Sequence, residues 1–126
     1  MNIPNDLRYS KSHEWIQTLP DGRVRIGLTD HAQSELGDLV FINLPAVGDA
    51  LTVGKTFADV ESVKAVSDIY SPVSGTVTAV NEAVLDDAAI VNENCYDAWL
   101  VEIGEIQEEE ELIDSAAYET LLKEGA

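Results

Sequence analysis

The chain has 126 residues, enough for one domain with a modest hydrophobic core. Its net charge of −17, from seven Lys and Arg against 24 Asp and Glu, argues against binding to nucleic acid or to anionic membranes. Hydrophobic residues make up 45% of the chain, and no apolar run reaches the roughly 20 residues of a membrane span. The acidic surface favours solubility, and it equally favours partners with basic docking faces.

The first residues and the single cysteine bear on the cellular compartment. Residues 1–15 contain no apolar signal-peptide core and are not rich in arginine, which argues against secretion and against an uncleaved transit peptide. Cys95 has no second cysteine to pair with, as is usual in a reducing compartment. We therefore expect a monomeric protein of the bacterial cytoplasm, with a mature mitochondrial matrix form as the alternative.

The first part of the chain predicts a hairpin followed by a short helix. Residues 7–28 form an extended lead-in and two strands, with a turn at 20–22 (Pro-Asp-Gly). The helix begins with Asp30 as N-cap, in a capping-box pattern with Gln33. Gly37 supplies the left-handed residue that ends it.

The middle of the chain contains a short internal repeat. After an apolar run of strand length at 39–42, the Pro-x-x-Gly stretch 44–48 recurs as 71–75, and at the same offset Gly54 matches Asn81, two residues that tolerate positive φ. Two matches this short can also coincide by chance. Read as a duplication, they predict a mainly β fold, a flattened antiparallel sandwich or barrel, with a short internal helix and a C-terminal helix.

A central hairpin is expected between the two repeated units. Residues 56–61 and 66–70 each have strand length, and residues 62–65 connect them. The connection contains no Asn-Gly or Asp-Gly, so the strongest hairpin signal is missing. If the hairpin forms, Lys64 projects into solvent from its tip.

The last part of the chain predicts a helical turn, a strand and a helix. Residues 81–87 have the pattern of a short helical turn, and residues 98–103 that of a strand. The tail from 108 to 122 is helical by pattern, with four glutamates in its first turn. We therefore expect one domain over residues 1–126, with its core at about 22–104 and its C-terminal helix at about 108–123.

The sequence contains no recognisable active site of its own. There is no Gly-rich phosphate loop and no Gly-x-Ser-x-Gly elbow. His13, His31 and Cys95 do not have the spacing of a metal site, so both histidines are interpreted as structural or solvated and no metal is expected. The chain is therefore predicted to be no enzyme.

Lys64 is the residue with the clearest chemical potential. Residues 65–122 contain no other lysine or arginine. An exposed lysine, with a pKa near ~10.4, is a poor Schiff-base catalyst but a good acceptor for an acyl group that another enzyme has activated. From the residues alone, a merely solvated lysine is the favoured interpretation of this position.

A family resemblance bears on this choice. Residues 61–65 (Glu-Ser-Val-Lys-Ala) and 67–75 (Ser-Asp-Ile-Tyr-Ser-Pro-Val-Ser-Gly) resemble the lipoyl-attachment segment of the glycine cleavage system H protein family. The similarity covers residues from about 4 to about 122 and includes other stretches of the chain: 9–15, 27–33, 36–38, 44–48 and 90–92, with Leu112 and Tyr118. Residues 88–90 and 95–99 lack the prolines usual in the family, so the shape of that loop stays open.

The resemblance implies a flattened antiparallel barrel-sandwich hybrid of the lipoyl/biotinyl kind, and a carrier that bears lipoate as N6-lipoyllysine at Lys64. Its arm would take an aminomethyl group from a pyridoxal-phosphate-dependent glycine decarboxylase to a tetrahydrofolate-dependent aminomethyltransferase. A flavin-dependent dihydrolipoyl dehydrogenase would reoxidise the arm, and a lipoate ligase or lipoyltransferase would attach it. The residues expected to be recognised around the lysine are Glu61, Ser62, Val63 and Ala65.

The resemblance also implies a cleft that shelters the loaded arm, with Ser12, Glu14, Asp68 and Ser71 as its expected residues. A carboxylate such as Glu14 could hold the ammonium end of the cargo by a charge-assisted hydrogen bond. A local bond within the turn at 13–15 is the alternative role for this side chain.

Three other functions remain open at this point. A lipoyl domain of a 2-oxo acid dehydrogenase, or a biotinyl carrier, is disfavoured because such domains lack the N-terminal His-Glu-Trp segment or expect Met where Val63 and Ala65 stand. A relay that passes lipoyl groups to other carriers shares every motif. The third is an acidic interaction module whose Lys64 is never modified.

Overall fold

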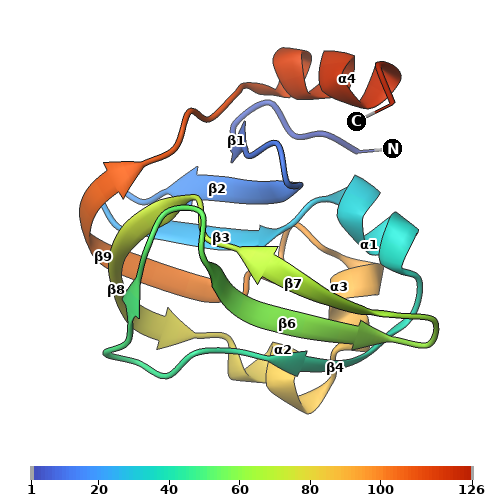
Figure 1. Ribbon diagram of the computed structural model, residues 1–126, viewed down its shortest axis with the longest axis horizontal. Coiled ribbons are helices and arrows are strands. Elements are labelled where there is room, and N and C mark those ends of the chain that lie inside the picture. Colours follow the sequence, from blue (N-terminus) through green and yellow to red (C-terminus); the bar gives the residue numbers. More distant parts are fainter. Residues whose placement is uncertain (1, 126) are drawn as a thin grey trace.

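The computed structural model describes residues 2–125 and is built from two antiparallel sheets (Figure 1). The larger sheet contains six strands in the order β1 (Arg8–Tyr9), β2 (Glu14–Thr18), β3 (Val24–Leu28), β9 (Val101–Glu109), β8 (Val73–Val80) and β5 (Ala50–Leu51). The smaller contains β4 (Leu39–Asn43), β6 (Thr56–Ser62) and β7 (Val66–Tyr70), in that order. The predicted class, mainly β with antiparallel sheets, is confirmed.

In the described part of the chain, four helices lie around the two sheets. They are α1 (Asp30–Leu36), α2 (Glu82–Asp86), α3 (Ala89–Glu93) and α4 (Ser115–Lys123). Figure 1 shows α1 beside the β6–β7 hairpin, and α4 at the end of the molecule where β1 lies. None of the helices among residues 2–125 has the length and apolar character needed to cross a membrane.

The core lies between the sheets and is supplied by the alternating inward residues of each strand. The part next to the small sheet includes Ile42, Val60 and Ile69, which pack with Leu28 and Leu100. The part inside the large sheet has its own cluster: Ile16, Val24, Ile26, Leu51, Val73, Val77, Val101 and Ile103. Each fully buried aliphatic side chain stabilises the fold by about 1.5–3 kcal/mol, so these clusters hold the hairpin onto the large sheet.

A third cluster attaches α4 to the N-terminal strands. The rings of Tyr9 and Tyr118 stack with their centroids 4.7 Å apart, and Leu7 and Trp15 pack beside them. Trp15 lies directly over Gly27, where an added Cβ would stand 2.4 Å from the indole ring. The Trp15 indole N–H donates to the Cys95 carbonyl at 3.0 Å, which links β2 to the segment after α3.

The predicted hairpins and the end of the first helix are confirmed. Gly22 has φ 91° in the turn between β2 and β3, and β6 and β7 flank the connection that carries Lys64. Gly37 caps the end of α1 with φ 81°. The predicted N-cap is wrong by one residue: the Thr29 hydroxyl accepts from the Ala32 amide and caps the helix, while Asp30 is its first residue.

The C-terminal helix begins later than predicted. The expected helix at 108–122 is wrong in its first turn, because β9 continues to Glu109 and pairs there with Val73 of β8. The helix starts at Ser115, with Asp114 as its N-cap through a 2.8 Å bond from Ala117 N. Pairing along the eight residues of β8 outweighs the helical pattern of the glutamates. The predicted strand at 98–103 likewise starts only at Val101.

The internal repeat does not give two equivalent turns. Gly48 lies in a turn with φ 96°, whereas Gly75 lies inside β8, where an added Cβ would stand 2.6 Å from the Gly104 carbonyl oxygen. Asn81 does not take the positive φ of Gly54; at φ −86° it caps α2. The loop left open by the sequence, residues 88–99, contains the short helix α3 and a turn at residues 95–97.

Gly75→Ala tests the close approach of β8 to β9. Its Cβ would meet backbone, which cannot rotate away, so we expect a loss of about 2–3 kcal/mol in the free energy of unfolding in urea. Gly104→Ala is the matched control, because its Cβ would meet the Thr78 methyl group and Arg23 methylenes, which can move. Equal losses in both variants would contradict this account of Gly75.

Candidate functional site

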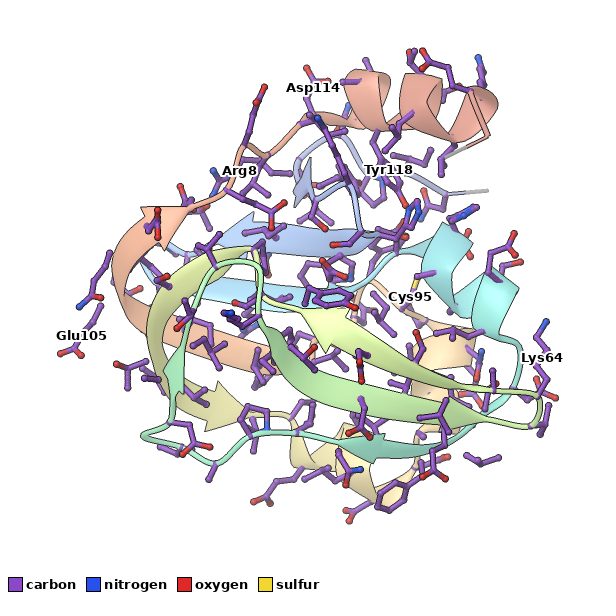
Figure 2. All side chains as sticks on the ribbon, viewed as in Figure 1. Arg8, Lys64, Cys95, Glu105, Asp114 and Tyr118 are labelled. Atoms are coloured by element: carbon purple, nitrogen blue, oxygen red, sulfur yellow. The ribbon has the colours of Figure 1, made fainter. Side chains whose placement is uncertain are left out.

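Lys64 lies at the tip of the β6–β7 hairpin, and Ser62 builds the turn that presents it. The Ser62 hydroxyl oxygen accepts from the amides of Lys64 (3.3 Å) and Ala65 (3.1 Å). The Ser62 amide donates to the Ala65 carbonyl at 2.8 Å and closes the turn. A serine turn of this kind replaces the missing Asn-Gly or Asp-Gly sequence. Figure 2 shows Lys64 at the far end of the hairpin.

The hairpin tip is also tied to the rest of the molecule. The Val63 amide donates to the Asp38 carbonyl at 3.0 Å, across to the corner between α1 and β4. The side chain of Lys64 lies over Gly37 in that corner: an added Cβ there would stand 3.2 Å from Lys64 Cε. Lys64 is exposed and, among the described residues, makes no ion pair. Its amine therefore stands in solvent on a fixed base.

The predicted recognition residues occupy different positions around the tip. Glu61, Val63 and Ala65 are exposed, and Val63 shows 70% of its surface to solvent. Ser62 is half-buried and shapes the turn. A second pair of exposed apolar side chains, Val40 and Phe41, lies on the neighbouring strand, where a register shift in β4 interrupts its pairing with β6.

A cleft of about 180 Å³ opens between α1, the start of β2 and strand β7. Its lining includes three of the four predicted cleft residues, Ser12, Glu14 and Asp68. Ser71 does not belong to it: this side chain is fully buried and donates to the Val73 carbonyl at 2.6 Å, at the start of β8. The other residues of the lining come mainly from α1 and the small sheet: His13, Leu28, His31, Ala32, Glu35, Leu36, Val60, Ser67 and Ile69.

Five polar residues of the cleft lining or its support were not predicted for it. His13, His31, Glu35 and Ser67 line the cleft, and Ser10 supports it from behind. The spacing of His31 and Glu35, four residues apart on one helix, places both on one face of α1 and was the available signal. Nothing in the sequence indicated that β2 and β7 would lie opposite that face.

Glu14 is the most unusual ionisable group of the cleft. It is 2% exposed, and its Oε1 accepts from the hydroxyls of Ser10 (2.7 Å) and Ser12 (2.6 Å). Burial raises the pKa of the carboxyl to about 7, with a further contribution from Glu110, although the two serine hydrogen bonds favour the charged form. Near neutral pH the group is therefore divided between acid and carboxylate, and a cation beside it would draw it to the carboxylate.

His13 connects the cleft to the C-terminal helix. Its backbone is in the left-handed region, φ 73°, and its Nδ1 lies 2.8 Å from the Tyr118 hydroxyl, which also contacts the Thr29 hydroxyl at 2.8 Å. Burial lowers the pKa of the imidazole, and the ring of His31, with centroids 4.5 Å apart, acts in the same direction. The structure thus gives His13 a structural role in addition to its place in the cleft wall.

The donor set does not suggest a metal centre. Among residues 2–125, no group of three or more His, Cys, Asp or Glu side chains is arranged to hold a metal ion. The cleft instead combines hydroxyls, carboxyls and imidazoles around an apolar floor of Leu28, Val60 and Ile69. Such a lining suits an organic ligand with a small cationic end.

Comparison with known proteins agrees with this arrangement. The family model described as Glycine cleavage H-protein matches residues 7–125. The chain belongs to this family. It is 48% identical over 128 residues to the glycine cleavage system H protein of Geobacillus kaustophilus (strain HTA426), covering 99% of this chain and 100% of the relative. It is 49% identical over 123 residues to that of Burkholderia ambifaria (strain MC40-6), covering 96% and 98%.

A solved structure shows the same fold. The crystal structure of a glycine cleavage system H protein from Mycobacterium marinum superimposes with a TM-score of 0.90 at 39% identity, covering 98% of this chain and 100% of that one. The chain is thus the lipoyl carrier of glycine cleavage, a non-catalytic member of that multienzyme system, and its family carries the lipoyl group on a lysine.

Glu14→Gln tests the perturbed carboxyl through stability. Because the folded-state pKa is raised from 4.5 to about 7, folding favours the protonated acid, and this stabilisation is complete below 4.5 and lost as pH rises through 7. Between pH 4 and pH 8, the free energy of unfolding of the protein with Glu14 should fall by about 3 kcal/mol more than that of the Gln variant. Urea titrations across that range measure the difference, and parallel pH profiles would refute the raised pKa.

Proposed function

We propose that Lys64 is the lysine that carries the lipoyl group, and that this chain moves an aminomethyl group between the enzymes of glycine cleavage. The observation that supports this most directly is the exposed amine at the tip of a tied hairpin, with the polar cleft beginning beside the same strand. When bound, the lipoyl group supplies thiol–disulfide chemistry at the end of a long tether.

The residues around Lys64 fit an amide at Nζ. The amine is exposed, so an acylating enzyme can reach it, and no ion pair within residues 2–125 would be broken when acylation removes its charge. Ala65 is too small to cover the lysine, and Val63 is exposed beside it. The closed Ser62 turn keeps the base of the arm in place while its far end moves.

The cleft suits the cationic end of an aminomethyl cargo. Asp68 is four residues beyond Lys64, so at the usual rise of a strand it lies about 13 Å from the tip, within reach of a long tether. Glu14 can become a carboxylate and hold an ammonium group by a charge-assisted hydrogen bond, while Ser10 and Ser12 fix its position. The apolar floor excludes water from the bond to be protected.

The specific partners follow from this role. We propose a pyridoxal-phosphate-dependent glycine decarboxylase, a tetrahydrofolate-dependent aminomethyltransferase, a flavin-dependent dihydrolipoyl dehydrogenase, and a lipoate ligase or lipoyltransferase. The net charge of −17 would attract basic docking faces on these enzymes. We also propose that the chain works as a single monomeric domain in a bacterial cytoplasm.

Lys64→Arg tests the attachment site. Arginine keeps the positive charge but cannot be acylated under these conditions, so the mass of a lipoyl amide should be absent from the variant when it is produced with lipoate. Lys55→Arg, at the opposite end of the same hairpin, is the control. It should be lipoylated as fully as the chain without substitutions. Intact-mass spectrometry decides between the sites, and lipoylation that persists in the Lys64 variant would overturn the assignment.

Glu14→Ala tests the role of the cleft. Removing the carboxyl leaves the ammonium end of the cargo without its partner, so methylamine should be released from the loaded protein about tenfold faster, while lipoylation stays unchanged. Glu108→Gln removes an exposed charge outside the cleft and should leave release unchanged. Release is followed by fluorescent labelling of free amine, and identical rates in all three proteins would refute the role of Glu14.

A further inference from the structure

Asn92 joins three parts of the structure that lie far apart in the sequence. It is on α3, and its amide nitrogen donates to the Gly37 carbonyl (2.9 Å) and to Gln33 Oε1 (3.0 Å). Its amide oxygen accepts from the Leu39 backbone N–H at 2.9 Å. The orientation of the amide is determined by these partners, since Gly37 offers only an acceptor and Leu39 only a donor. Both N–H groups of the side chain are used.

These bonds hold the corner between α1 and β4 at both its ends. Between Gly37 and Leu39 lies Asp38, and the carbonyl of Asp38 accepts the hydrogen bond from Val63 at the hairpin tip. The position of the tip relative to α1 therefore depends on the corner, which the half-buried Asn92 side chain holds together with the backbone bond from Gly37 to Gln33 and the pairing of Leu39 with Ser62. No other side chain among the described residues bonds to the backbone of this corner.

The same corner determines where the Lys64 side chain lies. The stem of the lysine crosses Gly37, with Cε 3.2 Å and Nζ 3.7 Å from the position of an added Cβ. The two residues before Gly37, Glu35 and Leu36, line the cleft. A side chain that crosses Gly37 therefore leaves the tip on the side of α1, the helix that forms one wall of the cleft; Figure 2 shows the labelled lysine on this side of the hairpin.

We propose that Asn92 is a positioning residue for the carrier arm: by holding the corner at 37–39 it directs the Lys64 side chain toward the cleft. This inference rests on the proposed function of Lys64. A tether that starts in the right direction loses less conformational freedom when its far end enters the cleft than one that starts from a mobile tip. Asn92 thus raises the fraction of time that the arm spends sheltered without touching the arm itself.

The first experiment uses the protein without lipoate. The protein without substitutions, labelled with ¹³C at its lysines, should show a nuclear Overhauser effect between the Lys64 ε-methylene and the Gly37 α-protons. Asn92→Ala removes all three bonds and should lose this signal. Asn92→Asp, which keeps the acceptor for Leu39 but places an oxygen against the Gly37 carbonyl, should lose it as well, and it preserves side-chain volume for folding.

Val91→Ala is the control for a merely structural effect. Val91 is fully buried on the same helix, so its truncation destabilises the fold without removing any bond to the corner. We expect the Lys64–Gly37 signal to survive in this variant. A signal that persists in both Asn92 variants, or that disappears equally in Val91→Ala, would overturn the proposal.

The second experiment uses the lipoylated and loaded protein. Methylamine should be released about fivefold faster from the Asn92 variants than from the protein without substitutions or from Val91→Ala. The reason is that the arm of the Asn92 variants spends less time in the cleft. Intact mass separates this inference from the function it rests on. If the protein without substitutions carries no lipoyl mass, the assignment of Lys64 is refuted. If the Asn92 variants are fully lipoylated and release methylamine at an unchanged rate, only the role of Asn92 is refuted.

Discussion

The hydrogen bond from the Val63 amide to the Asp38 carbonyl joins the two parts of the molecule that a carrier must keep in register. One part is the hairpin tip, which has to be open to other enzymes. The other is α1, which forms a wall of the cleft. Strand β6 pairs with β4 as far as Ser62, which lies opposite Leu39, and the Val63–Asp38 bond continues this attachment into the connection that carries Lys64. The pairing and this bond together keep the tip in place relative to the cleft, so only the exposed Lys64 side chain beyond it moves freely.

The charge of Glu14, and so of the cleft, depends on whether a cation lies beside it. Burial of Glu14 disfavours its carboxylate and raises its pKa to about 7, and Glu110 acts in the same direction. When a cation enters, the same carboxyl can ionise and pair with it. The two serine hydroxyls remain bonded in either state, so the geometry of the site does not depend on the proton. The cleft therefore responds to charge without having to rearrange.

The sequence predicts local features of this protein better than features that depend on contacts between distant segments. Gly22, Gly37 and the hairpin carrying Lys64 follow from turn chemistry and strand length, and the structure places them as expected. The start of the last helix does not, because pairing of Glu109 with Val73 is decided by β8, more than thirty residues away in the chain. Local pattern cannot weigh such a pairing against helix propensity.

The candidate site follows the same rule. The attachment motif is contiguous in the sequence and so could be found there. The cleft is assembled from residues 12–14, residues 28–36 and residues 67–69, whose proximity no spacing reveals. Ser71 shows the resulting error: it belongs to the contiguous motif, yet it faces the backbone of Val73 and not the cleft. For Asn92 the sequence missed a role. Its segment resembled the family but indicated no function for this side chain, and only the fold brings it to Gly37.

The charge distribution completes the separation between scaffold and arm. Four of the seven basic residues form ion pairs with acidic residues of the same chain: Arg8, Arg23, Arg25 and Lys123. Lys64 stands apart from them, beside the acidic Glu61 and Asp38. Acylation would remove one of the few positive charges and leave the tip uniformly acidic around exposed Val63 and Val66. If the arm is attached at Lys64, as proposed, its attachment therefore makes the potential around the tip more negative, which would favour partners with basic docking faces.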